Sequence, residues 1–188
     1  MGEFDKYLNP GVDRPSFAQC NHGKTYQLGP RVYYPSTSAH EWQLGEPTTR
    51  RLRIFAVDPS ALVREGKYAT IEIPYEKLAP GPIGCLFEVD TADLDTGKKP
   101  TETDPDLDGL KVLLGSGMAP SYSNPAFHAQ MVYGVASLVH RTFRRALGRQ
   151  IPWPFPPRDG VTRLRIRPFA GETQNAWYDP NQGTLNFG

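Results

Sequence analysis

The sequence predicts an α+β fold in which a mixed or antiparallel β-sheet packs on one long helix. Apolar residues recur at helical spacing across residues 124–148. Short segments of alternating apolar and polar residues precede that stretch, and further alternating segments follow it. Strands on both sides of a single long helix indicate the α+β class.

The chain has 188 residues, enough for one domain of ordinary size, and its pattern changes near residue 50. Residues 1–50 contain frequent prolines and glycines together with scattered aromatic residues. Disordered chains are poor in aromatics, so this composition predicts an irregular segment that wraps around the body, with a short strand near residues 31–34. Residues 51–188 are predicted to form the α+β lobe.

Three strands are expected before the helix, at residues 51–57, 68–73 and 83–89. Turn signals separate them, namely Asp58-Pro59 and Pro80-Gly81-Pro82. Short connections of this kind predict an antiparallel meander. A long polar connection, residues 90–117, then leads to the helix.

The helix is delimited by residues suited to its ends. Asn124 can cap the N-terminus, Pro125 can occupy the first helical position, and Gly148 can end the helix in a left-handed conformation. The apolar stripe is broad enough to predict a helix buried in the core. Its members are Phe127, Met131, Val132, Val135, Leu138, Val139, Phe143, Ala146 and Leu147.

After the helix, the proline-rich residues 151–157 are predicted to run extended, and residues 161–169 alternate like a strand. Residues 175–178 and 184–187 flank a turn-forming loop at residues 179–183, which predicts a β-hairpin.

Composition excludes several function classes. A net charge of +1 argues against a dedicated nucleic-acid partner, and no apolar stretch is long enough to span a membrane. The N-terminal residues lack the apolar region of a secretory signal. Two cysteines, Cys20 and Cys85, lie far apart in the sequence and are more typical of free thiols in a reducing compartment than of the alternative, a disulfide, so we expect a cytoplasmic protein.

No candidate metal motif is complete. His40-Glu41 begins like H-E-x-x-H, but the second histidine position holds Leu44. The acidic residues from Asp104 to Gly109 resemble half of an EF-hand loop, whose final glutamate position is Gly115. Cys20 and His22 have no second ligand pair. We therefore expect no catalytic residue, metal ligand or cofactor within this chain.

Other polar residues are interpreted structurally. His128 and His140 lie too far apart along the helix to share one ion, which favours packed or hydrogen-bonded imidazoles. Arg163, Arg165 and Arg167 share one face of a predicted strand, and with few aromatics nearby they indicate a solvated sheet face rather than a nucleic-acid surface.

Two stretches resemble a group of bacterial putative thermolysin-like zinc metallopeptidases of the gluzincin type. The first begins Asn124-Pro125-Ala126-Phe127-His128 and continues to residue 149, and it is similar to the helix of that group. The second, Gln174-Asn175-Ala176-Trp177-Tyr178 with Leu185-Asn186-Phe187-Gly188, is similar to the hairpin that follows. The resemblance covers about residues 50 to 188 and implies the fold of the N-terminal lobe.

In such enzymes the corresponding strand borders the active-site cleft and pairs with an extended substrate peptide. The resemblance therefore implies that Asn175, Ala176, Trp177 and Tyr178 bind a peptide or protein substrate. It also implies zinc in the complete enzyme, because the H-E-x-x-H helix of the family follows this hairpin.

The chain ends at Gly188, before the family's catalytic residues. It is a fragment of a longer protein, one half of a split enzyme that needs a C-terminal catalytic lobe, or a non-catalytic remnant. The apolar end at Phe187-Gly188 favours a chain incomplete at its C-terminus. The expected function is the substrate-strand lobe of a metallopeptidase, a hydrolase of peptide bonds, that is inactive alone. The alternative is a non-catalytic protein-interaction or structural module.

Overall fold

The computed structural model describes residues 17–19, 25–27, 43–58, 66–172 and 175–188. The chain divides into two units, Met1–Val32 and Tyr33–Gly188. In the first unit, strands β1 (Phe17–Gln19) and β2 (Thr25–Gln27) pair antiparallel. The strand predicted near residues 31–34, and most of the segment predicted to wrap the body, lie outside the described residues.

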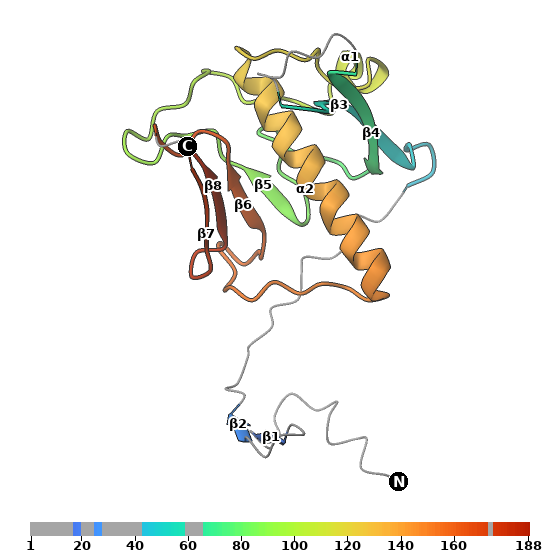
Figure 1. Ribbon diagram of the computed structural model, residues 1–188. Helices are drawn as coiled ribbons and strands as arrows, with labels where there is room; N and C mark the ends of the chain where they lie inside the picture. Colours follow the sequence, from blue (N-terminus) through green and yellow to red (C-terminus); the bar gives the residue numbers. More distant parts are fainter. Residues whose placement is uncertain (1–16, 20–24, 28–42, 59–65, 173–174) are drawn as a thin grey trace. The chain divides into compact units, whose positions relative to one another are not determined.

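The second unit is an α+β structure with two sheets and few helices (Figure 1). Strands β3 (Thr49–Phe55) and β4 (Tyr68–Pro74) form an antiparallel two-stranded sheet. Leu52 and Ile73 point inward and are fully buried, whereas Arg51 and Glu72 face solvent and form an ion pair at 3.0 Å. This alternation is what the sequence of both strands predicts.

The predicted meander is wrong at its third strand. Strand β5 (Phe87–Val89) begins at residue 87 rather than 83, and it pairs in parallel with β6 (Leu164–Arg167) in the other sheet. The residues before it fold back on themselves, because Ile83 N–H donates to the Ala79 carbonyl at 3.0 Å and Gly84 N–H to the Phe87 carbonyl at 2.9 Å.

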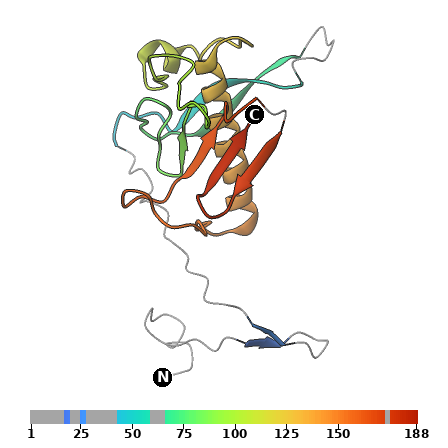
Figure 2. The same cartoon turned by 90° about the vertical axis from the view of Figure 1, so that its left-hand side faces the viewer.

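The second sheet has four strands in the order β5-β6-β8-β7. Strands β7 (Ala176–Asp179) and β8 (Thr184–Phe187) form the predicted antiparallel hairpin, and β8 pairs in parallel with β6. Between β5 and β6 the chain forms helices α1 (Leu110–Leu114) and α2 (Pro125–Leu147). Helix α1 falls within the long polar connection predicted at residues 90–117. Figure 2 shows α2 behind the four-stranded sheet.

Helix α2 starts and stops at the residues expected of it. The Asn124 side-chain oxygen accepts a hydrogen bond from Ala126 N–H at 3.0 Å, and Pro125 occupies the first turn. Gly148 follows with φ 64°, a left-handed conformation that suits glycine. The helix packs against β3, β4 and β5.

Burial of the apolar stripe is uneven, which corrects the expectation of a helix buried along its whole length. Phe127 is fully buried, whereas Val139, Phe143 and Leu147 are 47%, 59% and 51% exposed. The main core therefore joins the first half of α2 to the inner faces of β3, β4 and β5, with Leu52, Ile73, Phe87, Val89, Ala129 and Tyr133 among its members.

A buried polar cluster joins the loops around residues 76 and 108 to this core. Arg50, only 2% exposed, donates hydrogen bonds to the Leu107 carbonyl, the Glu76 carbonyl and the Asp108 carboxylate. Tyr133 O–H donates to the Glu76 carboxylate at 2.5 Å. Burial raises the pKa of Tyr133 well above its ordinary 10.0, so the phenol stays protonated and keeps donating.

Candidate functional site

The β7–β8 hairpin is built around a tight turn. The Asp179 carboxylate accepts hydrogen bonds from Asn181 N–H at 2.8 Å and Gln182 N–H at 3.3 Å. Gly183 N–H donates to the Asp179 carbonyl at 2.9 Å, and Gly183 has φ 62°. Aspartate at the start and glycine at the end are the residues that such a turn requires. The turn holds β7 at an edge of the sheet, where β8 is its neighbour.

The pairing register determines which backbone groups of β7 face outward. Gly188 N–H donates to the Asn175 carbonyl at 2.9 Å, and this pair marks a hydrogen-bonded position of the ladder. Hydrogen-bonded and non-hydrogen-bonded pairs alternate along antiparallel strands. Trp177, opposite Asn186, therefore bonds toward β8, whereas the backbone groups of Ala176 and Tyr178 point to the open edge.

The outward N–H of Ala176 already has a partner within the chain. It donates to the Asn175 side-chain oxygen at 2.8 Å. A peptide carbonyl that approaches Ala176 would have to displace this side chain. The Ala176 carbonyl and both backbone groups of Tyr178 point in the same direction, so the edge presents hydrogen-bonding groups at two alternate residues.

The side chains of β7 lie on opposite faces of the sheet. Tyr178 stands opposite Leu185 and therefore on the face toward α2, whereas Trp177 stands opposite Asn186 on the other face. Tyr178 is 45% exposed and Trp177 is half-buried. Burial, followed by the charge of Asp179, raises the pKa of Tyr178 above 10.0, so its phenol is neutral at physiological pH.

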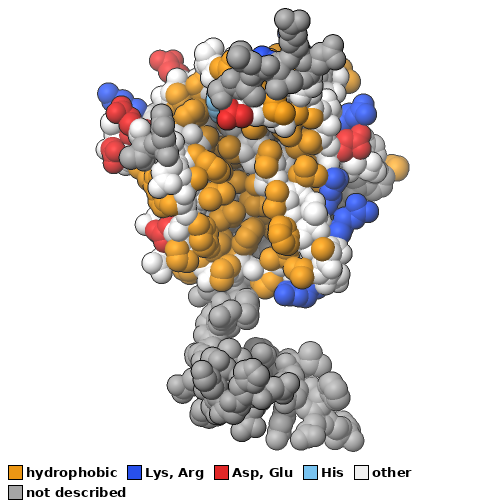
Figure 3. Space-filling model, viewed as in Figure 1, with side chains coloured by type: hydrophobic (Ala, Val, Ile, Leu, Met, Phe, Trp, Pro, Cys, Tyr) orange, Lys and Arg blue, Asp and Glu red, His pale blue; other side chains and the backbone are white. Residues whose placement is uncertain are grey.

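An apolar groove lies beside this edge, between α2 and the four-stranded sheet, with a volume of about 590 Å³. Its helix wall includes Val139, Phe143 and Leu147, and its sheet wall includes Leu185 and Phe187 of β8. Figure 3 shows the hydrophobic side chains gathered across this face of the molecule. The sequence analysis did not predict this groove. The sequence did contain a signal for it, because the end of the helix places apolar residues such as Phe143 and Leu147 among several arginines.

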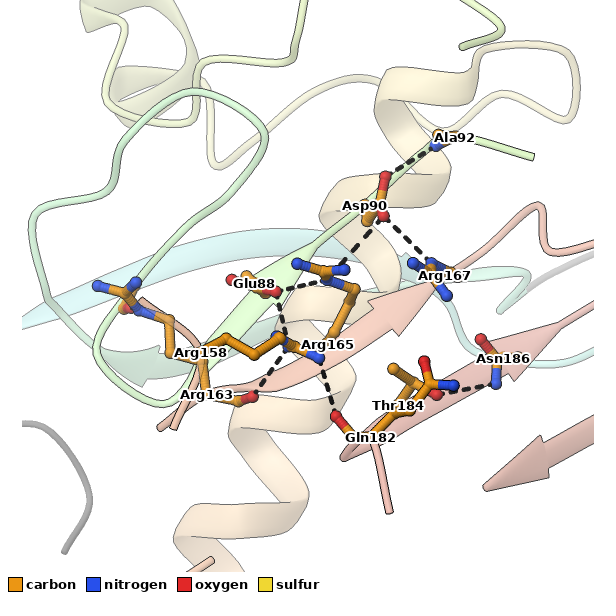
Figure 4. A network of polar contacts seen from close by, with 11 residues as sticks. Glu88, Asp90, Ala92, Arg158, Arg163, Arg165, Arg167, Gln182, Thr184 and Asn186 are labelled. Atoms are coloured by element: carbon orange, nitrogen blue, oxygen red, sulfur yellow. Dashed lines mark hydrogen bonds and ion pairs between the residues drawn. The ribbon is translucent and has the colours of Figure 1, made fainter. Parts of the chain in front are cut away.

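The opposite face of the same sheet is ionic (Figure 4). Glu88 of β5 accepts hydrogen bonds from Arg158 at 2.8 Å and Arg165 at 2.5 Å, and Asp90 accepts one from Arg167 at 3.1 Å. Arg165 and Arg167 retain 29% and 14% side-chain exposure. The expected solvated arginine face is therefore wrong, because these cations pair with carboxylates across the β5–β6 junction.

Arg163, the third arginine of the predicted face, bonds differently. Its Nε–H donates to the Gly84 carbonyl at 2.5 Å. All three arginines thus hold elements of the sheet together, and a nucleic-acid backbone would have to compete with these internal partners.

The acidic loop that resembles half of an EF-hand serves the fold. Asp108 pairs with Arg50 and also accepts from Leu78 N–H at 2.7 Å, and Asp104 pairs with Lys99 at 2.8 Å. Across the described residues, no group of three or more His, Cys, Asp or Glu side chains could hold a metal ion. The remaining sequence candidates, Cys20, His22 and His40-Glu41, lie outside the described residues.

Both helix histidines have the structural roles that the sequence predicts. A ring nitrogen of His128 lies 2.8 Å from the Tyr122 carbonyl oxygen. His140 packs against Phe87 and Trp153, with ring centroids 5.8 and 6.0 Å away, and lines the groove. Burial, then the charge of Arg144, lowers the pKa of His140 below 6.5, so its imidazole is neutral at pH 7.

Comparisons with protein-family models, curated proteins and solved structures found no match to this chain. The resemblance to thermolysin-like peptidases therefore stays a prediction from the residues that carry it. In the described part of the chain, no helix has the length and apolar content needed to cross a membrane.

Proposed function

We propose that this chain is the peptide-binding lobe of a zinc-dependent metallopeptidase, and that β7 receives an extended peptide as an added strand. The single observation that carries this proposal is the edge position of β7, with the backbone groups of Ala176 and Tyr178 directed outward. Main-chain pairing at such an edge supplies affinity without reading the sequence of the peptide.

The side chains around the edge give each added residue a distinct environment. A strand that pairs with β7 would place alternate side chains near Tyr178 on the groove side and near Trp177 on the ionic side. Asn175 stands at the entry and can exchange its bond to Ala176 N–H for one to the peptide. These four residues bind substrate in the proposal, and none of them performs chemistry.

The peptidase half of the proposal rests on the family resemblance. No group of the described residues fits a zinc site, so no catalytic step is assigned to those residues. In the proposed complete enzyme, zinc and the H-E-x-x-H residues belong to a C-terminal catalytic lobe in the cytoplasm. The second candidate function is a non-catalytic interaction module. Without a catalytic lobe, the same exposed edge of β7 would serve to bind a partner protein.

Replacing Ala176 with proline tests the edge. Proline lacks the outward N–H, and β7 does not use that group to pair with β8, so the hairpin should persist. The probe is an acetylated hexapeptide of alternating threonine and valine, titrated into the ¹⁵N-labelled chain. We expect amide shifts centred on Ala176 and Tyr178 in the wild type and at least about tenfold weaker binding in Ala176→Pro.

The matched control is Ala176→Val, which keeps the N–H and changes only the exposed side chain, and it should bind like the wild type. Equal binding by a folded Ala176→Pro chain would exclude β7 as the peptide site. The peptidase assignment has its own test in the parent reading frame. An H-E-x-x-H helix encoded after Gly188 supports the enzyme, and a stop codon there supports the interaction module.

A further inference from the structure

The four-stranded sheet is wider than the helix that covers it. Neighbouring strands lie about 4.8 Å apart, so four strands present a face well over one helix diameter of about 10 Å. Helix α2 packs on β5 at one edge and then on β3 and β4 of the other sheet. The helix-side residues Leu164, Leu185 and Phe187 of β6 and β8 are accordingly only partly buried.

Among residues 43–58, 66–172 and 175–188, none covers the helix side of the same groove. Val139, Phe143 and Leu147 repeat every four residues along one flank of α2 and are each about half exposed. This row extends over about 12 Å of helix at 1.5 Å per residue. Exposed apolar surface of this extent, concave and continuous with a sheet face, marks an interaction site.

The charged side chains on the helix side of the groove are cations. No aspartate or glutamate occurs between Asp108 and Asp159, whereas Arg141, Arg144 and Arg145 lie within the last turns of α2. Arg144 lies close enough to the groove residue His140 to affect it electrostatically. Figure 3 shows Lys and Arg side chains bordering the apolar surface on the lower right.

We propose that this groove binds an amphipathic α-helix of a partner protein, with the apolar face of that helix in the groove and acidic residues on its flank facing Arg144. A second copy of α2 fits poorly, because it would bring arginines against arginines. The proposal is independent of the peptide edge and of any peptidase activity.

The chemistry of the walls selects a helix over other occupants. Apart from His140, the groove is lined by apolar side chains, and the His140 Nε2 and Trp153 Nε1 atoms are buried out of reach. An extended peptide would leave its backbone groups without partners there, whereas a helix satisfies its own. Specific small-molecule sites place a few polar groups around the ligand, and this groove does not offer them.

The test uses two synthetic 18-residue helical peptides with the same leucine face, one with glutamates on its flanks and one with lysines. Calorimetric titration into the full 188-residue chain should show that the glutamate peptide binds at least about tenfold more tightly than the lysine peptide. The difference should shrink in high salt, because the charges are exposed.

Two variants locate the site. Phe143→Asp, at an exposed position, should leave the thermal melt nearly unchanged and abolish binding of the glutamate peptide. Arg144→Glu should weaken the glutamate peptide and strengthen the lysine peptide, which a loss of folding cannot produce.

Four outcomes would overturn the proposal. They are equal affinity of the two peptides, no binding of either, unchanged binding by Phe143→Asp, and self-association of the chain that blocks the groove. Binding to anionic phospholipid vesicles without binding to the glutamate peptide would assign the surface to a membrane instead.

Discussion

The two halves of α2 carry the same apolar periodicity and meet different surroundings. In the first half Phe127, Ala129 and Tyr133 are no more than 1% exposed, under the side chains of β3, β4 and β5. In the second half Val139 and Phe143 are about half exposed along the groove. An apolar stripe thus reports which side of a helix is suited to contact, and neighbouring elements decide whether that side is covered.

Polar residues differ between the halves in the same way. Gln130 is fully buried, and its amide accepts from Met118 N–H at 2.7 Å and donates to the Arg53 carbonyl at 2.9 Å. In the second half the polar positions are exposed arginines such as Arg144 and Arg145. The polar side chain of the first half of α2 therefore binds specific partners within the fold, whereas the polar side chains of the second half face solvent.

Truncating one phenylalanine in each half gives the largest expected contrast. Phe127→Ala should lower the free energy of unfolding by about 3–5 kcal/mol, because it leaves a cavity among packed rings. Phe143→Ala should change it by less than about 0.5 kcal/mol, because that side chain is exposed. Urea unfolding of both variants measures the difference, and similar losses would contradict the division of the helix.

Removing the Gln130 side-chain amide tests whether the polar residues of the two halves of α2 differ in their contribution to stability. Gln130→Ala leaves Met118 N–H and the Arg53 carbonyl without this partner, and should cost about 2 kcal/mol in the same unfolding experiment. The control is Thr142→Ala in the exposed half, where the hydroxyl bonds only to the Leu138 carbonyl of its own helix. That change should be neutral or slightly stabilising, since alanine is the better helix former.

The smallest expected effect is the pH dependence of His140. Its pKa is lowered in the folded chain, so on acidification the unfolded chain takes up a proton first. The free energy of unfolding should therefore decline as pH falls below about 6.5 and level off below the folded-state pKa. His140→Gln should remove this part of the decline. A His140→Gln profile identical to the wild type between pH 7 and 5 would show that the imidazole is solvated.

Local patterns were sufficient to predict the elements that depend on neighbouring residues. The ends of α2 follow from Asn124, Pro125 and Gly148, and the β7–β8 hairpin follows from its turn. The partner of β5 could not be predicted this way, because alternation in residues 83–89 does not show that the matching strand lies beyond the helix. Helix α1, with five residues, is too short to show a period.

The candidate site also has one part that local sequence predicts and one part that it does not. Asn175 to Tyr178 were identified as an edge from local sequence and the family resemblance. The groove was not, because it depends on which strands α2 leaves uncovered, and that is a property of the assembled sheet. The pairing of Arg165 with Glu88 was missed for the same reason, since the two residues become neighbours only when the parallel strands meet.

The ion pair between Arg165 and Glu88 joins positions 77 residues apart in the chain. The entropic penalty of closing a loop rises with the logarithm of its length, so this contact is harder to nucleate than the short β7–β8 hairpin. Folds dominated by such distant pairings cross their rate-limiting barrier slowly. We expect the hairpins to form early and the β5–β6 junction to close last, which would leave β5 the strand longest without a neighbour while the chain folds, since β6 can pair with the nearby β8.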